Sequence, residues 1–510
     1  MKPPNPSPTV LALRLPPFFD EAAVGQLIRG RSVYLVGGAV RDLLLGRAAY
    51  DLDFATEESG LQVGRRVAEA LQAHFYALDA ERDVGRVLVT RENRRWTLDF
   101  ASLRGPSIEE DLRARDFAIN SMAIPVHSPP RLIDPLGGES DLRDHLLRAS
   151  SPSAISDDPV RSVRAVRLAV QLGLRMERET REQVRSGASR LGAIAPERLR
   201  DEFFRILNGP RVAAAIRTLM SLRLLPAMVP EVVGLDTIVQ PPPHVHDVWS
   251  HTLLLMDRLE LLLAVLAPLP EEEVSADVIL GLVSLRLGRF RERISGHLQE
   301  MLADERPVRG LLFLSGLLHD AGKSETSSAK ISGAGPFSGH EELGGEWALH
   351  RALALRFSKE EAERITRTVR GHMRPLQLLR AGQVPPLAVY RYFRGLGPAG
   401  VDVSLLSLAD FLAIYGTTLP QPAWASLLDV VRTLLEGYFE RRTEIVEPPP
   451  YVNGDELMAT FGLRPGPQVG ELLEALREAQ VAGQVSSKGE ALSFARGRLG
   501  LAGATTAIGQ

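Results

Sequence analysis

The chain has 510 residues, of which 45% are hydrophobic, and a formal net charge of −3, so it is long enough for three or four domains with buried cores. It contains no cysteine, which excludes disulfide bonds and thiolate metal sites. The small net charge excludes a uniformly basic nucleic-acid-binding protein, although a local basic stripe would still bind RNA.

The first residues do not resemble a signal peptide. The stretch MKPPNPSPTVLALRLPPFF is interrupted by prolines and has no continuous apolar region. No apolar run in the chain is long enough to be expected to cross a membrane. We therefore expect a cytoplasmic protein without a membrane partner. Nothing in the sequence indicates an oligomeric state.

The N-terminal part of the chain shows alternating strand and helix patterns. Residues 33–36, 51–55, 86–90 and 95–101 are typical of strands, and 39–46 and 60–74 of helices. These patterns predict a small α/β head over residues 1–148.

The rest of the chain is predicted to be helical. Apolar residues at three- and four-residue spacing continue from 151 to 235 and from 244 to 437. The proline-rich stretches VQPPPHVHD and VEPPPYV interrupt them. We therefore expect a helical neck at 149–240, a histidine-rich helical domain at 241–440 and a helical tail at 441–510. The predicted fold class is α+β, with an α/β head followed by all-helical domains.

The stretch YLVGGAVRDLLLGRAAYDLDFAT combines a glycine turn with a carboxylate pair. Gly37 and Gly38 lie between a predicted strand and a predicted helix, where a polyanion could approach the backbone, and Arg41 is one turn into that helix. Asp51 and Asp53 are two residues apart on a strand and so face the same side. Paired carboxylates suit Mg²⁺.

These two features together indicate nucleotidyl transfer, in which metal ions activate a hydroxyl and neutralise charge on the triphosphate. Either feature alone is more often an ordinary turn or a solvated strand edge. Together and in this order, they resemble motif A of the class II nucleotidyltransferases, the family of bacterial tRNA CCA-adding enzymes and poly(A) polymerases. The resemblance implies that Asp51 and Asp53 are catalytic and hold Mg²⁺.

Further motifs extend the resemblance. EEDLRARDFAINSMAI is similar to the family's ribose-recognition motif, in which Arg115, Asp116 and Asn120 match, whereas Ala114 and Ala118 depart from it. LIDPLGGESDL matches the closing hairpin of the head, and PERLRDEFFRIL resembles a neck-stabilising motif. For Asp99 two interpretations remain open: a third carboxylate near the metals, or a sheet-edge residue.

SDDPVRSVRAVRLAVQLGL is similar to the family's nucleotide-templating motif, with Asp157 in place of a glutamate. Asp158 and Arg161 have helical i, i+3 spacing and are predicted to project together. A carboxylate accepts from an exocyclic amine and a guanidinium donates to ring acceptors, so the pair can read a base edge. Arg164 and Arg167 continue the spacing and could meet phosphates or the base. The alternative is a surface ion pair.

The histidine-rich region contains an ordered set of imidazoles and carboxylates. The set comprises His251, His319, Asp320, His340, His372 and Asp410. Such ligands favour Mn, Fe, Co, Ni, Zn or Mg, and an adjacent His-Asp pair can serve one or two metals that activate water. The run resembles an HD phosphohydrolase domain, which implies a second bound divalent metal. The domain either hydrolyses phosphoesters or serves as a scaffold for tRNA.

The tail resembles the family's C-terminal helical module, which implies contact with the tRNA backbone; a helical lid on the preceding domain is the alternative. The resemblance as a whole implies that the partners are the tRNA 3′ end, CTP and, for a full CCA-adding enzyme, ATP.

One segment departs from the family. Full CCA-adding members carry a flexible loop before the ribose motif that helps the site change from CTP to ATP, and residues 100–109, FASLRGPSIE, are too few to hold it. We therefore expect addition of two cytidines followed by a stall, with full CCA addition as a close competitor. A poly(A) polymerase, a metal-dependent HD phosphohydrolase with a nucleotide-binding head, and a non-catalytic RNA-binding protein are the further alternatives.

Overall fold

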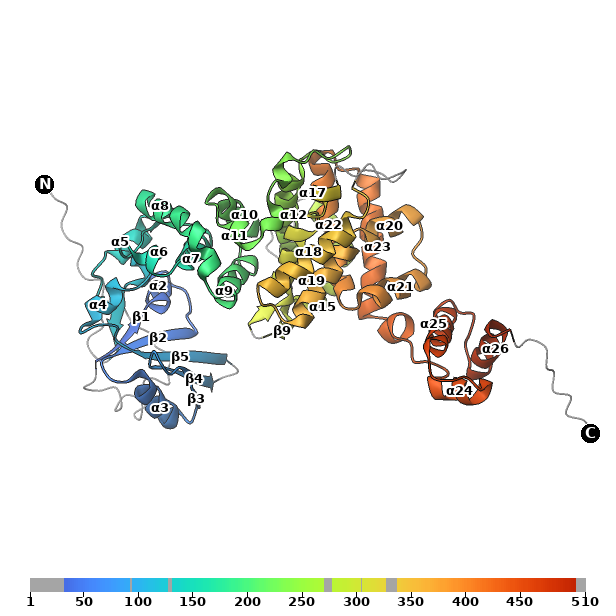
Figure 1. Cartoon of the computed structure of the whole chain (residues 1–510), viewed down its shortest axis with the longest axis horizontal. Helices are drawn as coiled ribbons and strands as arrows, with labels where there is room; N and C mark the ends of the chain where they lie inside the picture. Colours follow the sequence, from blue (N-terminus) through green and yellow to red (C-terminus); the bar gives the residue numbers. More distant parts are fainter. Residues whose placement is uncertain are drawn as a thin grey trace, which may run out of the picture. The chain divides into compact units, whose positions relative to one another are not determined.

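The computed structural model describes residues 32–91, 94–126, 131–269, 278–303, 305–326 and 337–500. The N-terminal stretch that was compared above with a signal peptide lies outside these residues. The chain forms two compact units, one made of residues up to 202 together with 218–227, and one made of 203–217 together with the residues from 228 onward. The first contains a mixed β-sheet and the second is mainly helical, which confirms the predicted α+β class (Figure 1).

The head of the first unit is built on a six-stranded sheet with the strand order β3-β4-β5-β2-β1-β6. Its strands are β1 (Val33–Val36), β2 (Asp51–Thr56), β3 (His74–Asp79), β4 (Val84–Arg91), β5 (Arg94–Ser102) and β6 (Ala123–Pro125). The pair β2–β5 is parallel and the other neighbours are antiparallel. Helix α3 (Gly60–Leu71) packs on β3, β4 and β5 with its apolar face (Figure 1).

The four predicted strands are present, and two strands were missed. β3 is an edge strand whose residues are mostly exposed, so its sequence HFYALD lacks the alternation that marks a half-buried strand. β6 has three residues, all buried, which is too short for any periodicity to show. Both strands are therefore set by pairing with neighbours rather than by local sequence pattern.

Helices and a small two-stranded sheet, formed by β7 and β8, complete the first unit and connect it to the second. They are α2 (Gly38–Leu44), α4 (Ile108–Arg113), η2 (Ala118–Asn120), α5 (Gly138–Arg143), β7 (Leu146–Leu147), α6 (Ala154–Asp157), α7 (Arg161–Leu172), β8 (Arg175–Met176), α8 (Arg178–Gly187), η3 (Ala188–Ala193), α9 (Pro196–Leu207), α10 (Val212–Ser221) and α11 (Leu225–Met228).

The second unit is a helical assembly around α12, α16, α19 and α22. Its elements before residue 340 are η4 (Pro230–Val232), η5 (Leu235–Thr237), α12 (Val248–Val265), α14 (Val278–Leu287), η6 (Gly288–Phe290), α15 (Arg291–Gln299), β9 (Met301–Ala303), β10 (Arg306–Pro307), α16 (Val308–Leu318) and α17 (Lys323–Thr326). The later ones are α18 (His340–Ala354), α19 (Lys359–Gly371), α20 (Arg374–Ala381), α21 (Pro386–Leu396), α22 (Ala399–Tyr415), η7 (Gly416–Thr418), α23 (Gln421–Phe439), η8 (Arg442–Val446), α24 (Gly454–Phe461), α25 (Pro467–Val481) and α26 (Lys488–Arg498).

Helix α22 corrects one expectation. We expected no apolar run of membrane-spanning length, yet Ala399–Thr418 is long and apolar enough to pass that test. Within the described residues it is the one helix that does so, and 89% of this apolar stretch is buried inside the protein. Such burial is typical of the core helix of a helical domain.

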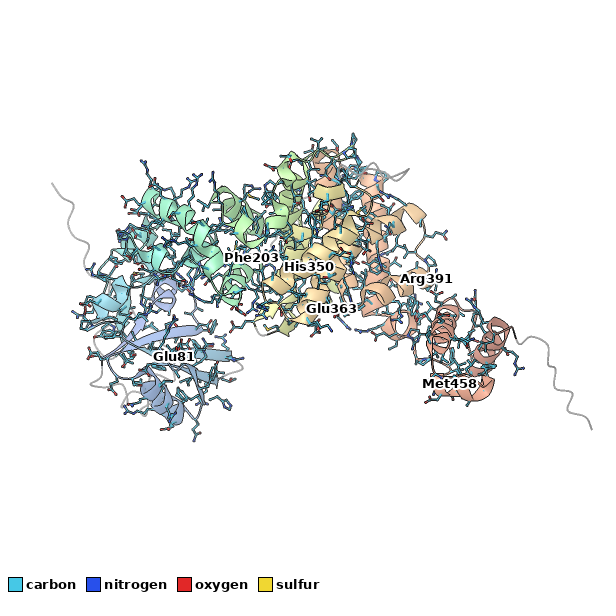
Figure 2. All side chains as sticks on the ribbon, viewed as in Figure 1. Glu81, Phe203, His350, Glu363, Arg391 and Met458 are labelled. Carbon is cyan, nitrogen blue, oxygen red and sulfur yellow. The ribbon has the colours of Figure 1, made fainter. Side chains whose placement is uncertain are left out.

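The last three helices form a small core of their own. Leu457, Leu472 and Leu476 are buried together with residues of α26, and Met458 on α24 is labelled in Figure 2. An Asn453 capping box starts α24, and Gly462 in left-handed conformation ends it.

Candidate functional site

The Gly-Gly pair forms the turn between β1 and α2. Gly37 has φ +73°, a left-handed conformation that residues with a Cβ rarely adopt. A Cβ at Gly37 would lie 3.1 Å from Nη1 of Arg115 and 3.6 Å from Oδ2 of Asp53. Gly38 then opens α2, whose first N–H groups lack partners within the helix. The turn therefore brings backbone N–H groups that have no partner within the helix, a guanidinium and a carboxylate into one place.

The two predicted catalytic carboxylates lie side by side on β2. Asp51 and Asp53 are exposed and alternate with the buried Leu52 and Phe54, as predicted for one face of a strand. Asp53 is the register partner of Asp99 in the parallel pair β2–β5. Since β5 lies between β4 and β2, Asp99 is not a sheet-edge residue, and that interpretation is wrong.

Arg86 on β4 neutralises Asp99. Its Nε and Nη2 donate to the two carboxylate oxygens of Asp99, each over 2.7 Å. The pKa of Asp53 is raised, mainly because surrounding protein atoms reduce the hydration of its carboxylate; Arg115 opposes this, and the charges of Asp99 and Asp51 add to it. Three carboxylates therefore gather on one face of the sheet; Arg86 and Arg115 offset part of their charge, and the repulsion that remains around Asp53 favours a bound cation.

A chain of polar contacts connects α2 with the ribose-like motif. Arg41 donates from Nη1 to Oδ1 of Asn120 over 2.8 Å and from Nε to Asp42 over 2.9 Å. Asn120 in turn donates to Oδ1 of Asp116 over 3.1 Å, and Oδ2 of Asp116 accepts from Arg164 over 3.1 Å. Burial would raise the pKa of Asp116, but Arg164 and Asn120 outweigh it and keep the pKa low. Asp116 therefore stays ionised.

Asp158 and Arg161 do not project from one helix, so that prediction is wrong. Asp158 has extended backbone (φ −146°, ψ 92°), because Pro159 disfavours helical conformation at the residue before it. Helix α7 begins only at Arg161. The two side chains nevertheless remain neighbours, with Nε of Arg161 3.9 Å from Oδ2 of Asp158.

Arg164 and Arg167 both bind Glu202 on α9, which is buried. Arg164 donates from Nη2 to Oε1 over 2.7 Å, and Arg167 from Nε to Oε2 over 2.9 Å. Burial opposes the charge of Arg164, yet Glu202 and Asp116 raise its pKa. Two of the arginines predicted to meet a nucleotide are therefore committed to internal ion pairs. Glu202 was not singled out from the sequence, because a glutamate on an amphipathic helix carries no signal of burial.

The segment between β5 and α4 is short, as the sequence indicated. β5 ends at Ser102, α4 begins at Ile108, and Ser107 caps the helix by accepting from Glu110 N–H. The backbone N–H of Arg104 donates to Asp111. The connection is tied to the helix that follows it and holds no extended loop.

The six predicted metal ligands of the second unit converge. Two groups of ligand atoms lie within 4.8 Å of one another: His251, His319 and Asp320, and Asp320, His340 and His372. Asp320 belongs to both groups, with Oδ2 3.1 Å from Nε2 of His319 and Oδ1 3.2 Å from Nε2 of His340. Asp410 on α22 approaches His251, with Oδ1 3.0 Å from Nε2. All six residues are buried.

The protein orients three of the imidazoles through backbone carbonyls. In His319, His340 and His372, Nδ1 lies within 2.6–2.9 Å of a carbonyl oxygen three residues earlier, so Nε2 is left for the centre of the cluster. Burial and, after it, the neighbouring imidazoles of His319 and His340 lower the pKa of His372 to about 3, which keeps His372 in the neutral form that binds metal.

Buried nitrogens without a regular hydrogen bond support metal binding here. Among the described residues, Nε2 of His251 and Nε2 of His319 make no hydrogen bond of normal geometry, although each lies within 3.0–3.1 Å of a carboxylate oxygen, that of Asp410 or Asp320. Buried polar atoms are normally satisfied, and a divalent cation between them and Asp320 would satisfy both. The donor set therefore fits one or two divalent metals.

The cluster opens into a cavity of about 530 Å³ that contains residues the sequence did not single out. Lys323 is buried and donates to Asp320 over 2.6 Å and to Gln240 over 2.8 Å. His244 lines the cavity with its ring 5.6 Å from that of His251. The only signal for Lys323 was its position three residues after Asp320, and His244 gave none.

Comparisons with known proteins agree with this architecture. Family models match four segments: the poly A polymerase head domain at residues 33–148, the RNA- and SrmB-binding site of polymerase A at 173–235, the HD domain at 284–401 and tRNA nucleotidyltransferase domain 2 at 441–495. The solved structure of a CCA-adding enzyme with ATP shares the fold, with a TM-score of 0.62 at 19% identity over 96% of this chain and 98% of that one. A Thermotoga maritima CCA-adding enzyme complexed with tRNA has a TM-score of 0.57 at 20% identity and the same coverage.

Full-length relatives are closer in sequence. The chain is 32% identical to an A-adding tRNA nucleotidyltransferase of Deinococcus radiodurans, over 94% of this chain and 96% of that protein. It is 33% identical to a CC-adding tRNA nucleotidyltransferase of Thermus thermophilus, over 91% and 93%. Fold and site thus define a nucleotidyltransferase with an HD domain, an enzyme class that depends on metal ions. The chain belongs to the tRNA nucleotidyltransferase family, which confirms the predicted resemblance.

Proposed function

We propose that this protein adds two cytidines from CTP to the 3′ end of tRNA with release of pyrophosphate. The observation that carries the proposal is the approach of the Gly37 backbone, the Arg115 guanidinium and the Asp53 carboxylate to one another. Backbone N–H groups and a guanidinium bind phosphate oxygens, and carboxylates bind the cation that accompanies a triphosphate.

Asp51 and Asp53 are the catalytic carboxylates in this proposal. They fit Mg²⁺, because they are hard oxygen ligands and because their mutual repulsion, increased by Asp99, is relieved by a cation. When bound, Mg²⁺ neutralises charge on the triphosphate and lowers the pKa of the attacking hydroxyl. The terminal hydroxyl of tRNA attacks the α-phosphorus, and the bond to the β-phosphate oxygen breaks.

The remaining head residues hold the nucleotide. Gly37, Gly38, Arg41 and Arg115 bind the triphosphate. Asn120 and the ionised Asp116 bind the ribose hydroxyls, and their contacts with Arg41 and Arg164 fix both side chains before the nucleotide arrives.

The base is read by Asp158 and Arg161. Asp158 accepts from the N4 amino group of cytosine, and Arg161 donates to N3 and O2. Arg164 and Arg167 contribute to the nucleotide site only indirectly, because their guanidinium groups already bind the carboxylate of Glu202. This role differs from the direct nucleotide contact that their spacing suggested.

The short connection between β5 and α4 favours a stop after two cytidines. Five residues, 103–107, separate the two elements, and Asp111 anchors them, so no flexible segment there can shift the site from cytosine to adenine. The two relatives named above carry A-adding and CC-adding names at nearly equal identity, so their names do not decide the matter.

The test supplies transcripts of one tRNA ending at the discriminator base, at C74 or at C75, each with CTP and ATP, and sequences the product ends. We expect the first two to end in CC and the third to remain unextended. A CCA end would establish full CCA addition, an A added only to the third transcript would establish A addition, and a long A tail on every substrate would establish a poly(A) polymerase.

A second activity is supported by the HD cluster. Buried imidazoles whose Nε2 atoms converge around Asp320, beside a cavity that Lys323 also lines, suit metal-assisted hydrolysis of a phosphoester. The residues fit Mn, Ni, Co, Fe, Zn or Mg. Bis(p-nitrophenyl) phosphate and p-nitrophenyl phosphate, assayed with each metal, test it; cleavage that is lost in His319→Ala and retained in Asp53→Ala would assign the activity to this site. No cleavage with any metal would leave the cluster a structural centre.

A cytoplasmic location and contact between the α24–α26 tail and the tRNA backbone complete the proposal. Helix α26 carries two exposed arginines in its last turn, Arg496 and Arg498.

A further inference from the structure

We propose that Arg198 is a positioning residue for nucleotide selection, which it controls by fixing the carboxylate of Asp158. The inference rests on the proposed role of Asp158 in reading the base. Nη2 of Arg198 donates to Oδ2 of Asp158 over 2.7 Å, across a separation of 40 residues in the chain. Arg161, the partner expected from the sequence, is 3.9 Å from the same oxygen.

Arg161 is held elsewhere and cannot fix Asp158. Its guanidinium donates three hydrogen bonds to backbone carbonyls, those of Ala114, Arg115 and Ala154. A guanidinium has five N–H donors, so two remain for a base. Arg161 is therefore rigid and ready to donate, whereas the orientation of Asp158 has to come from another group.

Arg198 is the group that supplies this orientation. Asp158 stands outside the helices in extended backbone, and among the described residues only Arg198 donates a side-chain hydrogen bond to its carboxylate. The adjacent Asp157 does not compete for Arg198, since its Oδ2 accepts from the hydroxyl of Ser153 over 2.8 Å. With Oδ2 bound to Arg198, Oδ1 of Asp158 is left as the acceptor for a base.

A fixed carboxylate discriminates between bases better than a free one. Cytosine and adenine present an amino group on the edge read by Asp158, whereas uracil and guanine present a carbonyl oxygen. A carboxylate held in place accepts from the amino group and repels the carbonyl. A carboxylate without Arg198 can rotate away or admit a water, so uracil is tolerated.

The ion pair between Arg198 and Asp158 is partly exposed to solvent: the side chain of Arg198 is 52% exposed and that of Asp158 is 24% exposed. An exposed ion pair adds little stability, so the contact is dispensable for folding. We therefore expect Arg198→Ala to alter selection and to leave the melting temperature close to that of the wild type.

The experiment measures kcat and KM for CTP and for UTP at saturating tRNA in Arg198→Ala, Arg198→Lys, Asp158→Ala and the double variant. We expect the CTP:UTP ratio of kcat/KM to fall about tenfold in Arg198→Ala, a change typical of one base-edge contact. The kcat for CTP should change far less than the ratio, and Arg198→Lys should recover part of the selectivity. Arg178→Ala, which removes an exposed arginine paired with Glu182, is the control and should keep the ratio.

The double variant separates an action through Asp158 from an independent one. If Arg198 acts through Asp158, the double variant has the ratio of Asp158→Ala alone; a further loss would overturn the inference. An unchanged ratio in Arg198→Ala, with a reduced one in Asp158→Ala, would also overturn it and leave base reading by Asp158 intact. An unchanged ratio in Asp158→Ala would instead refute the proposed reading of the base. Arg198→Gln replaces Arg198→Ala if the latter does not fold.

Discussion

Asp53 and Asp99 are register partners in the parallel strands β2 and β5, and Arg86 binds both oxygens of Asp99 while the carboxylate of Asp53 stays accessible. The structure therefore assigns different surroundings to two adjacent carboxylates. Asp99 is committed to an ion pair within the sheet, whereas Asp53 lies beside the Gly-Gly turn and Asp51 shares its strand face. Asp51 and Asp53 are in consequence the pair available to a metal and a triphosphate.

Asp51→Ala and Asp53→Ala should each lower nucleotide addition by at least about a hundredfold, because metal binding supplies several kcal/mol of transition-state stabilisation. Incorporation of labelled CMP into tRNA is the measurement, and circular dichroism should show an unchanged fold. Asp79→Ala, which removes an exposed carboxylate at the end of β3, is the matched control. Addition at a near wild-type rate by either site variant would refute the metal assignment.

Asp158→Ala should lose discrimination among the four nucleotides more than it loses turnover. Base-edge hydrogen bonds contribute roughly 1–3 kcal/mol each, whereas the carboxylates on β2 are unaffected. Competition between CTP and each other nucleotide measures the change, and Glu182→Ala, which removes an exposed carboxylate on α8, is the control. A CTP preference that survives in both Asp158→Ala and Arg161→Ala would mean that other groups select the base.

Gly37→Ala should abolish addition because its Cβ would lie 3.1 Å from Arg115, in the space that the triphosphate needs. Gly46→Ala is the control for backbone strain, since Gly46 also has positive φ, +69°, but nothing within 4 Å of the added Cβ. Both variants should lose a similar amount of stability, about 1 kcal/mol. Equal activity of the two variants would show that the close approach at Gly37 has no role.

Purified protein should contain a divalent metal bound at the HD cluster, and His319→Ala or Asp320→Ala should lose it. Elemental analysis after exhaustive dialysis against metal-free buffer is the measurement, with His350→Ala on α18, outside the cluster, as the control. CMP addition should change little, because the β2 carboxylates lie in the other unit. A metal-free wild-type protein would contradict the prediction.

Asp402→Asn should destabilise the second unit by about 3–5 kcal/mol, the usual effect of leaving one buried charge unpaired. Arg364 and His297 both bind Asp402, and all three side chains are buried. Glu363→Gln, in an exposed pair with Arg367 on α19 (Figure 2), should cost less than about 1 kcal/mol. Thermal melting of the full chain compares the variants.

The same ion pair predicts a pH dependence. Burial would raise the pKa of Asp402, but Arg364 and His297 outweigh it and hold the pKa below the usual aspartate value of 3.8. Because the folded-state pKa is depressed, the stabilisation is complete well above pH 3.8 and is lost as the pH falls through the folded-state pKa. The difference in melting temperature between Asp402→Asn and wild type should therefore shrink at acid pH and persist at neutral pH.

The sequence by itself determined the family, the order of the motifs and the face on which Asp51 and Asp53 lie. These follow from local rules: alternation along a strand, the conformational freedom of a Gly-Gly turn, and ligand types in a fixed order. The same rules found the four strands with clear alternation, and they missed β3 and β6, one too exposed and the other too short to show a pattern.

The tertiary structure alone decided which partners the charged side chains take. Arg164 and Arg167 have the spacing of nucleotide-binding residues, but they bind Glu202, which is distant in sequence and buried. Asp158 lies near Arg161, as its spacing suggested. However, Pro159 disfavours helical backbone at Asp158, and the carboxylate of Asp158 accepts a hydrogen bond from Arg198. Lysine and arginine side chains are long and find their nearest counter-charge in space, so the partner depends on packing between segments far apart in the chain, which a local pattern does not encode.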